Sequence, residues 1–226
     1  GFLVIMDVLK RRNFRKLALH SKVVLTTSIV LIVLGTVLLK FTEHISWMGA
    51  FFHSISARTA GFSTYSIGEF TNAGLFVLCV LMFIGASPGS TGGGIKTSTF
   101  FVLAQSTRSM FSKQAVGAFK RSISSQNVSK AYAISMLSAL VVIVATFLLC
   151  VLEPEFQFIQ LLFEVISAFG TVGLSTGITP DLSGAGKLVI ILVMFIGRLG
   201  AMTLISMWIE RPEKMIRYTE ETIAIG

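Results

Sequence analysis

Two segments of this chain carry residues that could bind a metal cation through the main chain. Each follows a short apolar stretch and reads Thr-x-Gly-x-Ser; the residues of interest are Thr59, Ala60, Gly61 and Phe62 in the first segment, and Thr171, Val172, Gly173 and Leu174 in the second. Glycine can adopt backbone angles that turn a carbonyl oxygen toward an axis, and rings of carbonyls replace the hydration shell of K⁺ in selective pores. The two segments therefore predict cation binding by carbonyl oxygens, with close helix packing through glycine as the alternative.

A glycine-rich segment lies inside a long apolar stretch. Positions 85–94 read GASPGSTGGG, and five glycines and one proline in ten residues disfavour a helix, at about 1 kcal/mol for each glycine and 3 for proline. If the apolar stretch spans a membrane, this segment forms a loop at mid-membrane, and a loop that moves easily could act as a gate. A simple helix kink is the alternative. The candidate gate residues are Gly85, Ser87, Gly89, Gly92, Gly93, Gly94 and Lys96, with Lys96 expected to anchor the following half-helix near the cytoplasmic side. Ile95 separates Gly94 from Lys96, which excludes a phosphate-binding loop.

Two arginines lie in apolar surroundings, where a charge is costly and needs a specific role. Arg198 interrupts the last apolar stretch and is expected to be a fixed cation that opposes the glycine-rich loop and completes the gate. Alternatively, it only bonds backbone carbonyls or a carboxylate such as that of Glu164. Arg58 directly precedes the first Thr-x-Gly segment, where it could bind the carbonyls of that loop or lie in a solvated outer mouth.

No arrangement of side chains indicates enzyme chemistry. His20, His44 and His53 lack metal-ligand spacing, and no Ser/His/Asp or paired-carboxylate pattern stands out. An intramembrane hydrolase would need a nucleophile and a base at the same depth. We therefore predict no enzyme activity and no metal beyond a cation at the carbonyls.

The composition indicates an integral membrane protein. The 226 residues are 53% hydrophobic and 13% charged, whereas a soluble domain carries about 25% charged residues. The net charge of +8 comes mostly from basic clusters at 10–22, 108–130 and 211–217. Basic loops stay in the cytoplasm, so these clusters predict topology and imply no nucleic acid.

Spanning helices require about 20 apolar residues, and four segments qualify: 23–41, 73–111 with its break, 131–152 and 187–209. Two shorter apolar pieces, 45–58 and 155–169, precede the Thr-x-Gly segments and have the length of re-entrant helices. The sequence also repeats itself, because a shift of 112 positions places Thr59–Gly85 on Thr171–Gly197 with eleven of 27 residues identical. Chance would give roughly two. One residue out of this register, Ser56 pairs with Ser167. The prediction is an all-α membrane fold with two consecutive helix–pore helix–helix repeats.

The segments TAGFS and TVGLS, GSTGGGIKTS after MFIGA, and MFIGRLG resemble the Trk/Ktr/HKT potassium transporter superfamily, and within it the bacterial Ktr-type (KtrB-like) membrane subunits. The resemblance implies a pore of four repeats, of which this chain, as part of a longer protein, holds the third and fourth and would not conduct alone. It implies the end of a preceding repeat and a basic segment at 1–22, the third repeat at 23–111, a cytoplasmic loop at 112–130, the fourth repeat at 131–209 and a tail at 210–226.

The same resemblance implies K⁺ uptake across the bacterial plasma membrane, with the Thr-x-Gly carbonyls as a selectivity filter. A less selective or Na⁺-preferring cation transporter of the same fold is the alternative, and a receptor or structural membrane protein would leave the repeat unexplained. No covalently bound cofactor is implied. Expected partners are membrane lipid, a second copy in a homodimer and a cytosolic nucleotide-binding regulatory subunit (a KtrA-like RCK ring). Nucleotide would bind that partner, whose contacts are expected on the basic loop 108–130 and the tail.

Overall fold

The computed structural model describes residues 2–112, 116–119 and 121–200, and this part of the chain is mostly helical. The α-helices are α1 (Phe2–Arg11), α2 (Leu19–Thr42), α3 (Trp47–Ser56), α4 (Asn72–Phe83), α5 (Thr97–Ser112), α6 (Ser125–Leu152), α7 (Phe158–Gly170) and α8 (Gly184–Leu199). Short 3₁₀ turns lie at Phe14–Lys16, Ile67–Glu69 and Thr179–Asp181. A two-stranded antiparallel hairpin, β1 (Gly117–Ala118) and β2 (Arg121–Ser122), joins α5 to α6.

The observed helices follow the predicted apolar segments. Within the described part of the chain, two helices, α2 and α6, are long and apolar enough to cross a membrane, and α4 and α7 are shorter apolar helices. The predicted segment 73–111 is two helices, α4 and α5, separated by the glycine-rich residues. The predicted segment 187–209 is described only as far as the end of α8, where Gly200 takes a φ of +83°. Residues 201–209 and the tail 210–226 lie outside the described part.

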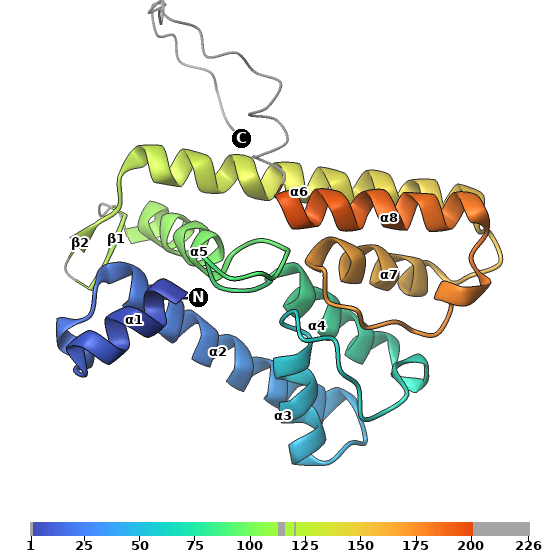
Figure 1. The fold of residues 1–226 in the computed structure, drawn as a ribbon, viewed down its shortest axis with the longest axis horizontal. Coiled ribbons are helices and arrows are strands. Elements are labelled where there is room, and N and C mark those ends of the chain that lie inside the picture. The colour runs from blue at the N-terminus through green and yellow to red at the C-terminus, as the bar shows by residue number, and fades with distance from the viewer. Residues whose placement is uncertain (1, 113–115, 120, 201–226) are drawn as a thin grey trace, which may run out of the picture.

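The helices form two groups that meet at α4 and α7. Figure 1 shows α6 and α8 side by side along one face, with α1, α2 and α3 at the opposite side. Helix α4 packs against both α2 and α7, and α7 packs against α6 and α8. Leu78 and Met82 of α4 and Phe163 of α7 are completely buried in the shared core. The short helix α7 is thereby enclosed by α4, α6 and α8, whereas α3 packs on α2 and leaves one apolar face exposed.

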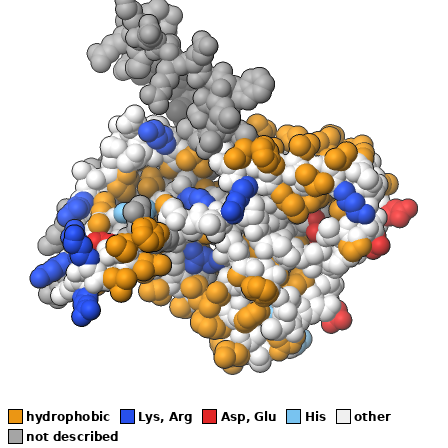
Figure 2. All heavy atoms as spheres, in the orientation of Figure 1, with side chains coloured by type: hydrophobic (Ala, Val, Ile, Leu, Met, Phe, Trp, Pro, Cys, Tyr) orange, Lys and Arg blue, Asp and Glu red, His pale blue; other side chains and the backbone are white. Residues whose placement is uncertain are grey.

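Apolar and charged side chains are sorted along the molecule. Large apolar side chains remain exposed on the long helices, for example Ile29, Phe147 and Leu192, as expected for surfaces that face lipid or further protein. In Figure 2 most Lys and Arg side chains gather at the end that carries α1 and the hairpin, and most acidic side chains lie at the opposite end.

In each half of the chain, a buried glutamate at the end of a long helix binds the N-cap residue of a later helix. Glu43 follows α2, and its Oε1 accepts hydrogen bonds from the amide (2.9 Å) and hydroxyl (2.7 Å) of Thr71, the N-cap of α4. Glu153 follows α6, and its Oε1 accepts from the amide of Ser183 (2.8 Å), the N-cap of α8. Carboxylates at helix N-termini satisfy free amides and interact favourably with the helix dipole. The start of α4 is thus fixed to the end of α2, and the start of α8 to the end of α6.

This cap gives a first prediction, on stability. Glu153→Ala should lower the thermal stability of the purified protein in detergent, because a buried hydrogen bond to a charged group is worth about 1.5–3 kcal/mol. The matched control is Glu155→Ala, since Glu155 is exposed. Equal unfolding temperatures for the two variants would contradict the capping role.

Candidate functional site

The two Thr-x-Gly loops, 112 residues apart in the sequence, lie against each other at their glycines. Gly61 has a φ of +78° and Gly173 a φ of +97°. A Cβ built on Gly61 would overlap the backbone carbonyl of Val172, and one built on Gly173 would lie 4.0 Å from the Gly61 Cα. Thr59 and Thr171, the first residues of the two loops, also have positive φ values, of 74° and 50°. The loops therefore share a conformation that ordinary side chains disfavour.

The preceding helices hold both loops in the same way. The amide of Ala60 donates to the Ser56 carbonyl (3.0 Å), and the amide of Val172 donates to the Ser167 carbonyl (2.9 Å). The hydroxyls of the same serines then donate to carbonyls beyond the glycines, Ser56 to Phe62 and Ser167 to Leu174. Each loop is therefore clasped by one serine in the last turn of its helix.

This clasp divides the loop carbonyls into two groups. The carbonyls of Phe62 and Leu174 each accept a hydrogen bond from a helix serine. Among the hydrogen bonds between described residues, none ends on the carbonyl oxygens of the residues before them: Thr59, Ala60, Gly61, Thr171, Val172 and Gly173. Backbone carbonyls inside a protein are normally satisfied, so this second group is the one with free capacity for a cation.

The glycine-rich loop lies against the start of both Thr-x-Gly loops. The amide of Gly93 donates to the Thr171 hydroxyl (2.8 Å), and that of Gly94 to the Phe169 carbonyl (3.3 Å). A Cβ on Gly92 would overlap the Thr59 hydroxyl. The absence of side chains thus permits contact with both halves of the site at once.

The ends of this loop are tied together, while its middle is open. Ile84 and Ile95 form an isolated parallel bridge, and a Cβ on Gly85 would overlap the Gly93 carbonyl. Ser87 accepts from the amide of Ser90 (3.2 Å) in a tight turn, and Gly89, with a φ of +71°, has open space around it. The chain leaves α4 and enters α5 at nearly the same place.

Two cations hold neighbouring carbonyls of the loop. The Arg198 guanidinium of α8 donates through Nη1 to the Thr91 carbonyl, and Lys96 donates through Nζ to the Gly92 carbonyl. Arg198 is exposed and Lys96 is buried only in part. The structure thus places both of the predicted cations against the glycine-rich loop.

Two interactions predicted as alternatives for the arginines are wrong: the pairing of Arg198 with Glu164, and the binding of loop carbonyls by Arg58. Glu164 does not pair with Arg198, because its carboxylate accepts hydrogen bonds from Ser175, Thr176 and Thr179. Arg58 binds Ser28 of α2, through Nη1 to the carbonyl (3.3 Å) and Nη2 to the hydroxyl (3.2 Å). It is half-buried and donates neither to loop carbonyls nor into an outer mouth, because the end of α3 packs against the middle of α2.

Sequence reasoning had not assigned a function to the clasping serines, and it considered Glu164 only as a partner of Arg198. A signal was present for the serines, since Ser56 and Ser167 match in the repeat one residue out of its main register. The extra residue falls where α7 continues to Gly170, whereas α3 ends at Ser56. The offset therefore marks the helix-to-loop transition.

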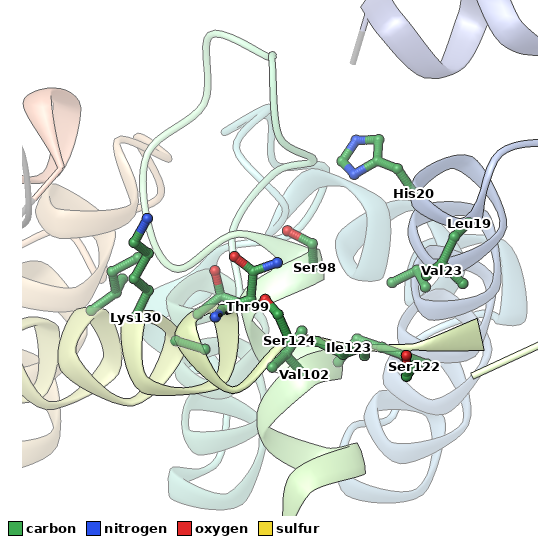
Figure 3. Close-up of a pocket in the computed structure, with 14 residues that line it drawn as sticks. Leu19, His20, Val23, Ser98, Thr99, Val102, Ser122, Ile123, Ser124 and Lys130 are labelled. Carbon is green, nitrogen blue, oxygen red and sulfur yellow. Dashed lines mark hydrogen bonds between the residues drawn. The ribbon is translucent and has the colours of Figure 1, made fainter. Parts of the chain in front are cut away.

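Two cavities adjoin these elements. One of about 380 Å³ lies behind the second Thr-x-Gly loop, between α7 and α8, and is lined by Glu164, Gly173, Ser175 and Met194 among others. Another, of about 530 Å³, lies between α2, α5, α6 and the hairpin. Figure 3 shows His20 and Lys130 at opposite ends of this second cavity, and none of the predicted site residues lines it.

Comparisons with known proteins agree on one group of relatives. The chain is 42% identical over its full length to the Ktr system potassium uptake protein B of Vibrio alginolyticus, covering 53% of that protein. It is 36% identical to the protein of the same name from Bacillus subtilis and 38% identical to the potassium/sodium uptake protein NtpJ of Enterococcus hirae, covering 54% of each. The chain therefore spans about half the length of these relatives.

The fold agrees with the sequence relatives. The crystal structure of the potassium transporter TrkH from Vibrio parahaemolyticus matches 92% of the chain with a TM-score of 0.72 at 20% identity, covering 48% of that protein. The family described as TrkH, cation transport protein, matches residues 11–217. The chain belongs to the TrkH family of cation transport proteins.

Proposed function

We propose that this chain forms half of a K⁺ pore, with the carbonyls of the two Thr-x-Gly loops as half of its selectivity filter. The observation that carries the proposal is the direct apposition of Gly61 and Gly173, with carbonyls in each loop that accept no described hydrogen bond. Helices α3 and α7 end at these loops, so their partial negative charge is directed at a cation there. The relatives' names as potassium uptake proteins agree with this ion.

The clasp refines which carbonyls we assign to the ion. Among the described residues, no hydrogen bond reaches the carbonyls of Thr59, Ala60, Gly61, Thr171, Val172 and Gly173, whereas those of Phe62 and Leu174 each already accept one from a serine hydroxyl. A carbonyl has two lone pairs, so Phe62 and Leu174 stay in the filter as its outermost and weakest ligands. Such a short filter implies few ion sites.

In this proposal the chain comprises two helix–pore helix–helix units. The first is α2, α3 and α4–α5, and the second is α6, α7 and α8. We assign them to the third and fourth repeats of a four-repeat pore from the order of their motifs, and a chain that spans about half of its relatives has room for two of four repeats. The basic end of the molecule is cytoplasmic and the acidic end faces outward, in line with the positive-inside rule.

The glycine-rich loop and Arg198 are the gate. The loop lies against Thr59 and Thr171, on the side where α3 and α7 end, so it would cross the path of an ion that leaves the filter. Arg198 and Lys96 hold its carbonyls and place positive charge on that path. Ion flow then requires the loop to move.

The name Ktr system in two relatives agrees with a multi-component assembly. We propose a homodimer of the complete subunit in membrane lipid and a cytosolic nucleotide-binding regulatory partner. The basic segment 108–130 and the tail are the surfaces that we propose for contact with the regulatory partner. In this arrangement nucleotide binds the partner, and K⁺ is the only ion held by the pore.

A second candidate is a less selective transporter that also admits Na⁺. The relative named potassium/sodium uptake protein, at 38% identity, favours keeping this alternative. The glycine in each of the two described loops favours K⁺, because its carbonyls can line the axis without a side chain.

The test is uptake by the complete protein in bacterial cells that lack their own K⁺ transporters. We expect growth on limiting K⁺ that an empty vector does not support, with saturable uptake of K⁺ or its analogue Rb⁺. Equal uptake of Na⁺ would favour the second candidate. If cells whose membranes contain the protein show no growth and no cation uptake, both candidate functions are overturned.

A further inference from the structure

We propose that Glu164 is a positioning residue that fixes the second filter loop from behind and gives it a tighter hold on K⁺ than the first loop has. This inference rests on the proposed function of the loops. It concerns a carboxylate that is 5% exposed and whose described hydrogen bonds come from residues 175–179 and not from the gate residues.

The carboxylate of Glu164 gathers the outer part of the second loop. Its Oε1 accepts from the Ser175 hydroxyl (2.7 Å), the Thr176 amide (2.9 Å) and the Thr176 hydroxyl (3.1 Å), and its Oε2 accepts from the Thr179 hydroxyl (2.7 Å). All four partners can act as donors, which matches the needs of a carboxylate anion. Hydrogen bonds to a charged acceptor are the stronger kind, so the segment 175–179 is held firmly.

Glu164 acts together with the clasping serine. Ser167 lies one turn further along α7 and binds the Leu174 carbonyl at 2.6 Å. The helix thus grips the loop at consecutive points directly after Gly173, and the cavity behind the loop is lined by Glu164 and Gly173. Because the backbone is continuous, the position of residues 174–176 limits how far the Gly173 carbonyl can swing.

The first unit has a different residue at the matched position. His53 stands three residues before Ser56, as Glu164 stands three before Ser167. The His53 ring is completely buried; its Nδ1 contacts the Gly49 carbonyl (2.9 Å) and its Nε2 the Ser63 hydroxyl (3.2 Å). One contact to the first loop replaces four, and no carboxylate is present. The first loop is therefore less firmly held from behind than the second.

The contrast with the other buried glutamates separates positioning from general support. Glu43 and Glu153 bind the N-caps of α4 and α8, away from the Thr-x-Gly residues. The Glu164 carboxylate instead binds the continuation of a filter loop. Removing it should affect ion binding, whereas removing Glu153 should affect only how much folded protein there is. The negative charge of Glu164 adds to its effect on ion binding, because it attracts a cation across the low-dielectric interior.

The experiment measures K⁺ uptake by the complete protein in K⁺-transport-deficient cells, for Glu164→Gln and for the matched control Glu153→Gln. Glutamine keeps the size of the side chain but removes its charge and one acceptor. We expect Glu164→Gln to raise the KM for K⁺ about tenfold and to reduce discrimination against Na⁺, as weakening of a charge-assisted contact would. Glu153→Gln should keep the wild-type KM and selectivity, whatever its abundance.

A milder variant covers the case in which Glu164→Gln does not reach the membrane. Thr179→Val removes one donor and keeps the shape, and we expect a smaller shift of KM and selectivity in the same direction. A wild-type KM and wild-type selectivity in either Glu164→Gln or Thr179→Val, at normal abundance, would overturn the inference. Absence of uptake by the wild type would instead overturn the proposed function.

Discussion

Gly61→Ala should abolish K⁺ uptake. Its Cβ would overlap the backbone carbonyl of Val172, which belongs to the opposite filter loop and is one of its proposed ion ligands. Backbone cannot yield as a flexible side chain can, so the two loops would be forced apart. The φ of +78° adds strain of about 1–2 kcal/mol for a residue with a Cβ. The measurement is growth and Rb⁺ uptake at limiting K⁺, corrected for the amount of protein in the membrane.

Gly177→Ala is the matched control, because it separates backbone strain from displacement of the filter. Gly177 has a φ of +100°, but a Cβ there would meet nothing within 4 Å. We expect uptake to persist in this variant, with a raised KM for K⁺, because Gly177 lies in the segment 175–179 that Glu164 holds. Gly173→Asp should be as inactive as Gly61→Ala, since it places a carboxylate beside the opposite glycine. If Gly61→Ala or Gly173→Asp supported growth as well as the wild type, the proposal that the loops line the ion path would be wrong.

Arg198→Ala should raise the maximal rate of K⁺ uptake several-fold and leave the KM close to that of the wild type. The guanidinium donates to the Thr91 carbonyl and so holds the glycine-rich loop in its place against Thr59 and Thr171. Without it, the loop loses one of its two cationic contacts, and the ion path loses a repelling positive charge. The filter is unchanged, so the affinity for K⁺ should be retained. Initial rates of uptake over a range of K⁺ concentrations measure both quantities.

The control is Lys187→Ala on the same helix. Lys187 also donates to a backbone carbonyl, that of Pro180 (2.7 Å), but at the opposite end of α8 from the loop. Its removal should leave the rate unchanged. Arg198→Lys should give an intermediate rate, because lysine keeps the charge without the planar fork of donors. An unchanged rate in Arg198→Ala at equal abundance would assign Arg198 a purely structural role.

Much of the fold follows from local sequence. The apolar runs that became α2 and α6 are long enough to predict spanning helices by length alone. The break between α4 and α5 follows from glycine and proline, whose effect on a helix needs no partner. The matching positions of Gly61 and Gly173 in the repeat indicated two equivalent loops, because glycines in such loops meet a backbone requirement that is independent of neighbours.

The partners of the polar side chains were decided by tertiary structure. Arg58 binds Ser28, thirty positions earlier, and Glu164 binds its own loop rather than Arg198. The sequence supplied the donors and acceptors, but a hydrogen bond requires heavy atoms about 3 Å apart, and that proximity arises only when helices pack. The helix positions and the breaks between helices were therefore readable from residue type and order, whereas the contacts of the Thr-x-Gly loops and of Arg198 with Thr91 depended on how α3, α7 and α8 meet.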